Sequence, residues 1–152
     1  MIEYKKGNLL DVTEGVIVHG CNMKGVMGSG VAKAIREKYP DCYARYKLSL
    51  GDPWGKPKLG DIIWWISPTE KLFIANGLTQ ENFGSDSTVR YANYAAIANV
   101  FRLVVLTNKG YESDINFPKI GAGLGNCDWN IIEQLINDSD PHDKYRKVCW
   151  VL

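Results

Sequence analysis

Short apolar runs alternate along the chain with stretches in which apolar residues recur every three or four positions. This alternation is typical of an α/β domain, in which helices cover a sheet. The pattern predicts about six strands and four helices in mixed order. The predicted strands are Ile2–Lys5, Val16–His19, Asp61–Ile66, Leu72–Asn76, Asp114–Phe117 and Val148–Leu152. The second of them is apolar on both faces until its last residue, as expected of a strand in the centre of the sheet.

The first two predicted helices follow each other closely. Val31, Ile35 and Tyr39 recur at intervals of four and form the core face of the first helix. Pro40 ends this helix because a proline disfavours helical backbone in the residue before it. A second helix is predicted from about Asp41 to Leu48 and ends at Gly51.

The third and longest helix is predicted to begin with Thr88 as its N-cap and to end at Asn108–Gly110. Its core face is predicted to carry Val89, Ala92, Ala96, Val100 and Leu103. The fourth helix is predicted to begin near Asp128. Its buried residues are predicted to be Trp129, Ile132 and either Leu135 or Ile136.

Two segments without periodicity remain. Residues 51–58 form a connector that is too short to separate two folding units, so residues 1–152 are predicted to form one domain. Gly77–Ser87 is polar and contains two glycines, which predicts a loop long enough to cover a binding site.

The charges are nearly balanced, with 18 Lys and Arg against 17 Asp and Glu and a formal net charge of +1. This balance argues against nucleic acid or a membrane as the principal partner. It leaves open a small charged ligand that is held by the backbone.

The cysteines and the N-terminus indicate the compartment. The sequence MIEYKKGNLLDV lacks the apolar core of a signal peptide, and apolar runs such as Ile62–Ile66 are too short to span a membrane. The four cysteines form no CxxC pair and are interpreted as free thiols, so a reducing, cytoplasmic location is expected. A zinc site of His19, Cys21 and Cys127 would depend entirely on the fold, and no metal or cofactor is predicted.

Two glycine-rich segments, Gly25–Gly30 and Gly121–Gly125, each follow a predicted strand and precede a predicted helix. Glycines let a ligand approach the backbone, where amide groups and a helix N-terminus favour an anion. Each amide bond to a charged group contributes roughly 1.5–3 kcal/mol. Two such loops could hold a diphosphate without a lysine. The alternative is that the glycines form only turns. Neither G-x-x-x-x-G-K-[ST] nor G-x-G-x-x-G occurs.

Three motifs together resemble the macrodomain family over essentially the whole chain. They are KGNLLD at 6–11, IVHGCNMKGVMGSGVAKAI at 17–35 and NFPKIGAGLGNCDW at 116–129. The resemblance is nearest to the branch of the yeast-type ADP-ribose 1''-phosphate phosphatase and the terminal ADP-ribose protein glycohydrolase. It implies a three-layer α/β/α sandwich with a mixed, about six-stranded sheet and a cleft for ADP-ribose.

The resemblance also implies three groups of ligand-binding positions. The adenine would meet Gly7, Asn8 and Leu9. Many macrodomains have an aspartate at the position of Asn8. The alternative is that Asn8 is only a turn residue. The distal ribose and diphosphate would meet Cys21, Asn22, Met27, Gly28, Ser29, Gly30 and Val31. The predicted polar loop also offers Thr79, Gln80 and Asn82, any of which could contact the distal ribose. The second phosphate loop would comprise Ile120, Gly121, Ala122, Gly123, Leu124, Gly125 and Asn126.

Two residues are candidates for catalysis. His19 matches the histidine implicated in the yeast-type phosphatase, and a pKa near neutrality would let it activate a water or protonate a leaving oxygen. The alternative is a buried structural histidine. Asp128 could activate a water, but it also suits a helix N-cap.

The sequence departs from the glycohydrolase at two positions. Gly77–Ser87 contains no lysine to serve as the nucleophile, and glycine stands at position 125 in place of an aspartate. A Schiff-base mechanism is therefore excluded. The predicted function is hydrolysis of ADP-ribose 1''-phosphate to ADP-ribose and phosphate. A non-catalytic reader of ADP-ribose and a hydrolase that removes ADP-ribose from modified proteins are the alternatives.

Overall fold

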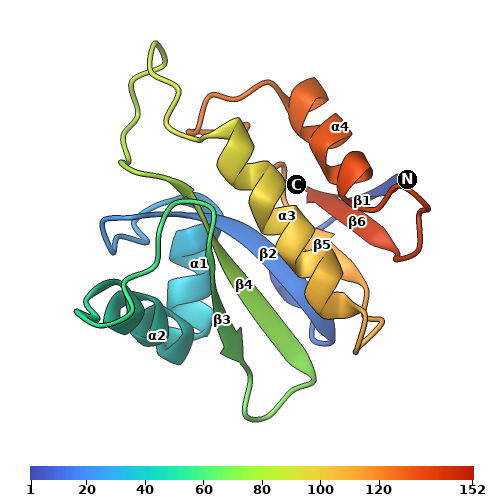
Figure 1. The fold of residues 1–152 in the computed structure, drawn as a ribbon, viewed down its shortest axis with the longest axis horizontal. Helices are drawn as coiled ribbons and strands as arrows, with labels where there is room; N and C mark the ends of the chain where they lie inside the picture. Colours follow the sequence, from blue (N-terminus) through green and yellow to red (C-terminus); the bar gives the residue numbers. More distant parts are fainter.

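The computed structural model describes residues 1–152, and a six-stranded sheet forms its middle layer (Figure 1). The strands are β1 (Ile2–Lys6), β2 (Gly15–Asn22), β3 (Ile62–Ile66), β4 (Leu72–Gln80), β5 (Ile115–Phe117) and β6 (Lys147–Val151). Their order across the sheet is β1-β6-β5-β2-β4-β3. All neighbouring strands are parallel except β3 and β4, which are antiparallel. The predicted mixed sheet is confirmed.

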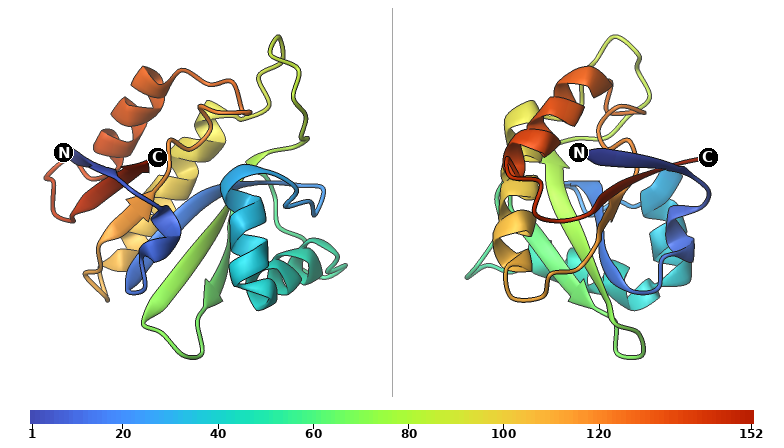
Figure 2. Two further views of the ribbon diagram at one scale, coloured as in Figure 1. Left: turned by 180° about the vertical axis from the view of Figure 1, so that it is seen from behind. Right: turned by 90° about the vertical axis from the view of Figure 1, so that its right-hand side faces the viewer.

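Four helices cover the two faces of this sheet. They are α1 (Gly30–Lys38), α2 (Pro40–Leu50), α3 (Tyr94–Asn108) and α4 (Trp129–Ser139), and a short 3-10 turn, η1, spans Leu9–Asp11. Figures 1 and 2 show α1 and α2 on one face and α3 and α4 on the other, so the three-layer α/β/α fold is confirmed. None of these helices is both long and apolar enough to cross a membrane.

Strand β2 lies between β5 and β4 in the sheet, and its apolar run is buried from both sides. Val16 and Val18 pack into the larger core under α3 and α4, while Ile17 packs into the core under α1. Full burial of each such side chain contributes roughly 1.5–3 kcal/mol. Because all three are at most 4% exposed, β2 is held firmly, and its carboxyl end supplies a fixed floor for the loops that follow.

Strand β4 is longer than predicted and takes in the first four residues of the expected Gly77–Ser87 loop. Gly77 pairs with Gly20 of β2 and with Ile62 of β3. A Cβ on Gly77 would lie 2.7 Å from Val100 Cγ1, so this glycine marks where α3 approaches the sheet closely. Gly77 therefore allows close packing of α3 on the sheet and does not mark the start of a loop.

The predicted N-cap of the longest helix, Thr88, is wrong, because α3 begins after Asn93. The Asn93 side chain accepts a hydrogen bond from the Ala96 amide at 3.0 Å and so caps the helix. Thr88 instead donates its hydroxyl hydrogen to Asp86 at 2.7 Å. Val89, predicted to face the core, is 40% exposed because it precedes the helix. By contrast, the boundary at Pro40 is confirmed, since α1 ends at Lys38 and Pro40 opens α2.

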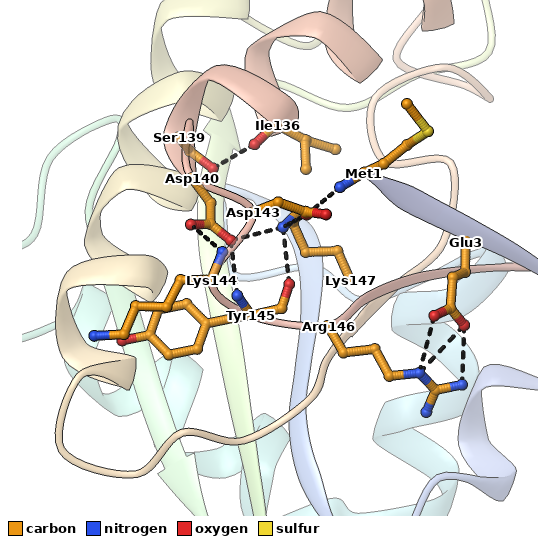
Figure 3. Close-up of polar contacts among 10 residues, drawn as sticks. All are labelled: Met1, Glu3, Ile136, Ser139, Asp140, Asp143, Lys144, Tyr145, Arg146 and Lys147. Atoms are coloured by element: carbon orange, nitrogen blue, oxygen red, sulfur yellow. Dashed lines mark hydrogen bonds and ion pairs between the residues drawn. The ribbon is translucent and has the colours of Figure 1, made fainter.

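The turn between α4 and β6 encloses a buried ammonium group (Figure 3). The side chain of Lys147 is 1% exposed, and its Nζ donates to Asp140 Oδ2 at 2.7 Å, Asp143 Oδ1 at 2.9 Å and the Tyr145 carbonyl at 2.8 Å. The N-terminal amine of Met1 also contacts Asp143. This polar cluster joins the end of α4 to the strands at one edge of the sheet.

Candidate functional site

A cleft of about 670 Å³ opens at the carboxyl ends of the parallel strands. Its size falls within the roughly 300–1,000 Å³ of small-molecule sites. Three segments form it: the loop leading into α1, the end of β4 with residues 80–85, and the loop after β5. The predicted site residues that line it are His19, Asn22, Gly28, Ser29, Gly30, Val31, Thr79, Gln80, Ile120, Gly121, Gly123, Leu124 and Gly125. The structure thus brings both glycine loops to one cleft.

The first wall of the cleft is the N-terminus of α1. The first hydrogen bond of this helix is donated by the Lys33 amide to the Ser29 carbonyl at 3.2 Å, and the Gly30, Val31 and Ala32 amides donate none within the chain. Ser29 is the N-cap, yet its side chain forms no capping bond. The unbonded amides therefore stand at the positive end of the helix dipole, where an anion is stabilised.

The second wall is the loop after β5, and its backbone is similarly unsatisfied. The amides of Gly121, Gly123, Leu124 and Gly125 donate no hydrogen bond within the chain. The loop is fixed by other bonds, including one from the Cys127 amide to the Gly121 carbonyl at 2.9 Å. Unbonded donors on both walls make the cleft a receptor for an anion that reaches from one wall to the other.

Gly125 has no room for a side chain. A Cβ at this position would lie 2.6 Å from the Gly121 carbonyl oxygen and 2.9 Å from Ala92 Cβ. The aspartate that the glycohydrolase branch carries there therefore does not fit this loop conformation. The backbone conformation of this loop therefore requires a glycine at position 125.

The floor of the cleft is formed by Gly20, Thr79 and Ile120. A Cβ on Gly20 would lie 2.6 Å from Thr79 Oγ1 and 3.3 Å from Ile120 Cγ1, so a glycine is needed for these two residues to meet. Thr79 is 1% exposed. Its hydroxyl can contact a ligand that reaches the floor.

Asn22 holds the first loop in place. Its Nδ2 donates to the Val26 carbonyl at 2.7 Å, and its Oδ1 accepts from the Lys24 amide at 2.9 Å and from the Tyr46 hydroxyl at 2.9 Å. These bonds occupy most of its polar atoms. The residue therefore positions the loop as well as lining the cleft.

Sequence reasoning missed part of the lining, notably Phe83, Gly84, Ser85 and Lys119. Lys119 directly precedes the second glycine loop and is the one Lys, Arg, Asp or Glu among the lining residues. Its position within the motif NFPKIGAGLG was the signal that could have identified it. Since no carboxylate lines the cleft, its charge favours anionic ligands.

Several predicted binding residues lie outside the cleft lining. Asn8 caps η1 by accepting from the Leu10 amide at 2.9 Å, which is the turn role that the sequence left open. The side chains that belong to the cores or pack against them are Leu9, Cys21, Met27 and Ala122. Gly7 packs beside Trp150, since a Cβ there would lie 3.2 Å from its ring. Asn126 donates to the Val89 carbonyl at 2.6 Å and ties the second loop to the segment before α3.

Asp128 is the N-cap of α4 and accepts a hydrogen bond from the Asn130 amide at 2.9 Å. It does not line the cleft. The structure thus favours the capping alternative over activation of a water. Cys127 packs in the core under α3 and α4, away from Cys21, so the residues considered for zinc are not brought together.

His19 lies at the floor of the cleft but is 1% exposed. Its Nε2 lies 2.6 Å from Asn76 Oδ1. Asn76 Nδ2 donates to the Ile63 carbonyl, so Oδ1 is left to accept from the imidazole. Burial lowers the pKa of His19 to about 4, against the smaller opposing effect of the Asn76 bond. The expectation of a pKa near neutrality is wrong, and His19 is uncharged at neutral pH.

The depressed pKa of His19 predicts a loss of stability in acid. The unfolded chain, with an ordinary histidine pKa near 6.5, takes up a proton before the folded protein does. The stability that His19 contributes is therefore complete above about pH 6.5 and falls by about 3 kcal/mol as the pH falls to about 4. Urea unfolding at about pH 7.5 and about pH 4.5 should show a smaller loss in His19→Gln than in the native protein. An equal loss in both proteins would contradict the assignment.

Comparison with known proteins identifies the family. The family model described as "Macro domain" matches residues 18–136. An uncharacterized 17.5 kDa protein of enterobacteria phage T4 is 32% identical over 146 residues, covering 90% of this chain and 88% of the phage protein. An ADP-ribose 1''-phosphate phosphatase of Candida albicans is 26% identical and covers 92% of this chain and 94% of its own length. A DNA ADP-ribosyl glycohydrolase of Mycobacterium tuberculosis is 27% identical, but this chain spans only 37% of its length.

Solved structures show the same fold. The macrodomain of Mycobacterium tuberculosis DarG superposes with a TM-score of 0.83 at 21% identity, covering 100% of this chain and 98% of that one. Thermosipho africanus DarTG in complex with ADP-ribose superposes with a TM-score of 0.81 at 17% identity, covering 96% of this chain and 40% of that one. At these identities the structures support the fold alone. With a family model that matches most of the sequence, this chain belongs to the macrodomain family.

Proposed function

We propose that the cleft binds ADP-ribose and that the protein hydrolyses ADP-ribose 1''-phosphate to ADP-ribose and phosphate. One observation carries the binding proposal: unbonded backbone amides stand on both walls, at Gly30–Ala32 on the first and at Gly121, Gly123, Leu124 and Gly125 on the second. Hydrogen bonds to a charged group contribute roughly 1.5–3 kcal/mol each. Two or three of them would hold a diphosphate without a metal ion or a cluster of lysines.

The reaction replaces one bond to phosphorus by another. A water oxygen attacks the phosphorus of the 1''-phosphate, and the bond from phosphorus to the ribose oxygen breaks. The proton released by the water goes to the departing ribose oxygen, so the products are ADP-ribose and inorganic phosphate. Negative charge on the phosphoryl oxygens is stabilised by amides of the glycine loops and by Lys119, the single cation of the lining.

The cleft offers no side chain that is suited to acid–base catalysis at neutral pH. No carboxylate lines it, and His19 is uncharged at neutral pH. The proposed catalysis therefore depends on positioning and electrostatic stabilisation. The relatives support the same choice, because this chain spans 94% of the Candida albicans phosphatase but 37% of the mycobacterial glycohydrolase. Residues 77–87 also lack the lysine nucleophile of the glycohydrolase branch.

Release of inorganic phosphate from ADP-ribose 1''-phosphate tests the proposal. We expect turnover by the native protein and a kcat/KM roughly 10- to 100-fold lower in Lys119→Met, the loss expected for one bond to a charged group. His19→Gln should retain most of the native rate, since no proton transfer is assigned to His19. A rate lost in His19→Gln but kept in Lys119→Met would contradict the mechanism.

The lining without carboxylates also favours a second candidate, a reader that binds ADP-ribose without turnover. The two functions differ in one result. A native protein that binds ADP-ribose in calorimetry but releases no phosphate is a reader. Release of ADP-ribose from modified protein, without phosphatase activity, would instead identify a hydrolase of ADP-ribosylated proteins.

A further inference from the structure

The charges are distributed unevenly over the chain, although the net charge is +1. Residues 24–58 contain eight Lys and Arg and three Asp and Glu, while the rest of the chain contains ten and fourteen. The positive segment comprises the first cleft loop, α1, α2 and the connector to β3, which lie together on one side of the molecule (Figures 1 and 2). None of its eight basic side chains forms an ion pair. The charge of this side is therefore uncompensated.

Two of these cations converge on one aromatic ring next to the cleft. Arg36 of α1 and Lys47 of α2 lie 5.8 and 5.4 Å from the centre of the Tyr43 ring. The Tyr43 hydroxyl donates to the Gly25 carbonyl at 3.4 Å, and a Cβ on Gly25 would lie 4.0 Å from Lys47 Cγ. Because Gly25 lies in the loop that leads into the first wall, both cations stand beside the entrance of the cleft.

An unpacked tryptophan extends this surface. Trp54, in the connector that directly follows α2, is 96% exposed. Lys56 and Lys58, which follow it in the connector, are also exposed. A flat aromatic ring beside lysines gives an unstacked base a face to stack on and its phosphates a positive surface, which is the combination that binds single-stranded nucleic acid.

We infer that this basic face, defined as Lys24, Arg36, Tyr43, Lys47, Trp54 and Lys56, binds single-stranded nucleic acid. The inference goes beyond the proposed function, because a strand can bind the basic face whether or not the cleft is occupied. The near-neutral net charge does not oppose this interaction, because the acidic side chains lie mainly elsewhere in the chain. A double helix fits less well, since its stacked bases cannot reach Trp54.

Fluorescence anisotropy with a labelled oligodeoxythymidine of about 12 nucleotides tests the basic face. If about four phosphates are neutralised, affinity should fall roughly 50-fold between about 50 and about 200 mM salt. Arg36→Glu/Lys47→Glu should weaken binding at least tenfold, and Trp54→Ala roughly tenfold. The matched control is Lys71→Glu/Lys109→Glu, which makes the same charge change at the β3–β4 turn and the end of α3. It should change the affinity by less than about threefold.

Measuring strand binding and ADP-ribose binding separately distinguishes a failure of the basic face from a failure of the proposed function. Calorimetry should show unchanged affinity for free ADP-ribose in Trp54→Ala and in the control pair, because these changes lie outside the cleft lining and away from its entrance. A native protein that binds ADP-ribose but no strand overturns the basic face alone. A protein that binds the strand but no ADP-ribose supports the basic face and contradicts the proposed function. Equal weakening by the control pair, or binding to phosphatidylserine vesicles with no binding to the oligonucleotide, also overturns the inference.

Discussion

Replacement of Gly28 by glutamate is expected to abolish ADP-ribose binding and to leave the fold intact. Gly28 is exposed at the first wall of the cleft, and an added Cβ would meet only Val26 Cγ1, at 3.4 Å. The new carboxylate would stand next to the unbonded amides of the first turn of α1, where it competes for them and repels a diphosphate. We expect Kd to rise at least about 100-fold, equivalent to about 2.7 kcal/mol, in isothermal titration calorimetry.

The control for this variant is Gly110→Glu. Gly110 follows α3, and a Cβ there would meet no atom within 4 Å, so the same charge is added without a clash and away from the cleft. Gly110→Glu should bind ADP-ribose as the native protein does, and both variants should keep the native melting temperature. If Gly28→Glu binds within about threefold of the native affinity, the first wall does not hold the diphosphate.

The largest effect on stability is expected for Asp140→Ala. Asp140 is the buried partner of Lys147, whose side chain is 1% exposed (Figure 3). Without it, the ammonium keeps only the half-exposed Asp143 carboxylate and the Tyr145 carbonyl. The amides of Lys144 and Tyr145 also lose their acceptor. Leaving a buried charge without its partner costs roughly 3–5 kcal/mol, so urea unfolding should show a loss of this size.

Two further variants isolate the cause of that loss. Asp140→Ala/Lys147→Met removes both charges and should regain part of the stability, since no buried ammonium is left without its buried carboxylate partner. Asp114→Ala breaks an exposed ion pair with Arg146, in which both side chains are about half exposed, and should cost less than about 1 kcal/mol. A cost for Asp140→Ala no greater than that for Asp114→Ala would show that the buried pair does not stabilise the fold.

Asp140 also contributes to the pH dependence of stability. Burial alone would raise its pKa, but hydrogen bonds from Lys147 and from the amides of Tyr145 and Lys144 together lower it below 3.8. Because the folded pKa is the lower one, the contribution is present above about pH 3.8 and is lost as the pH falls through the folded pKa. This loss falls at lower pH than the loss due to His19.

Much of the fold follows from local sequence signals. The run Val16–Val18 is apolar on both faces, which placed β2 inside the sheet, and Pro40 located the boundary between α1 and α2. The start of α3 could not be read in this way. Thr88 and Asn93 both suit an N-cap, and the choice depends on bonds from Asn126 to the segment before the helix. Such contacts join residues that are far apart in the sequence.

The candidate site was predictable where backbone geometry determines it and not where burial does. The two glycine loops were located from their spacing after strands and before helices. The pKa of His19, by contrast, depends on its burial and on Asn76, 57 residues later in the sequence. The net charge did not predict the basic face for a similar reason, because it sums over segments that the fold places on different sides.

We propose that unbonded amides of the two glycine loops hold the diphosphate of ADP-ribose. Titration of the 15N-labelled protein with ADP-ribose, followed by amide NMR, tests it most directly. We predict that the largest shift changes occur at the amides of Gly30, Val31 and Ala32 and at those of Gly123, Leu124 and Gly125, together in one titration. Saturable changes confined to one loop, or centred on residues outside the cleft, would contradict the account.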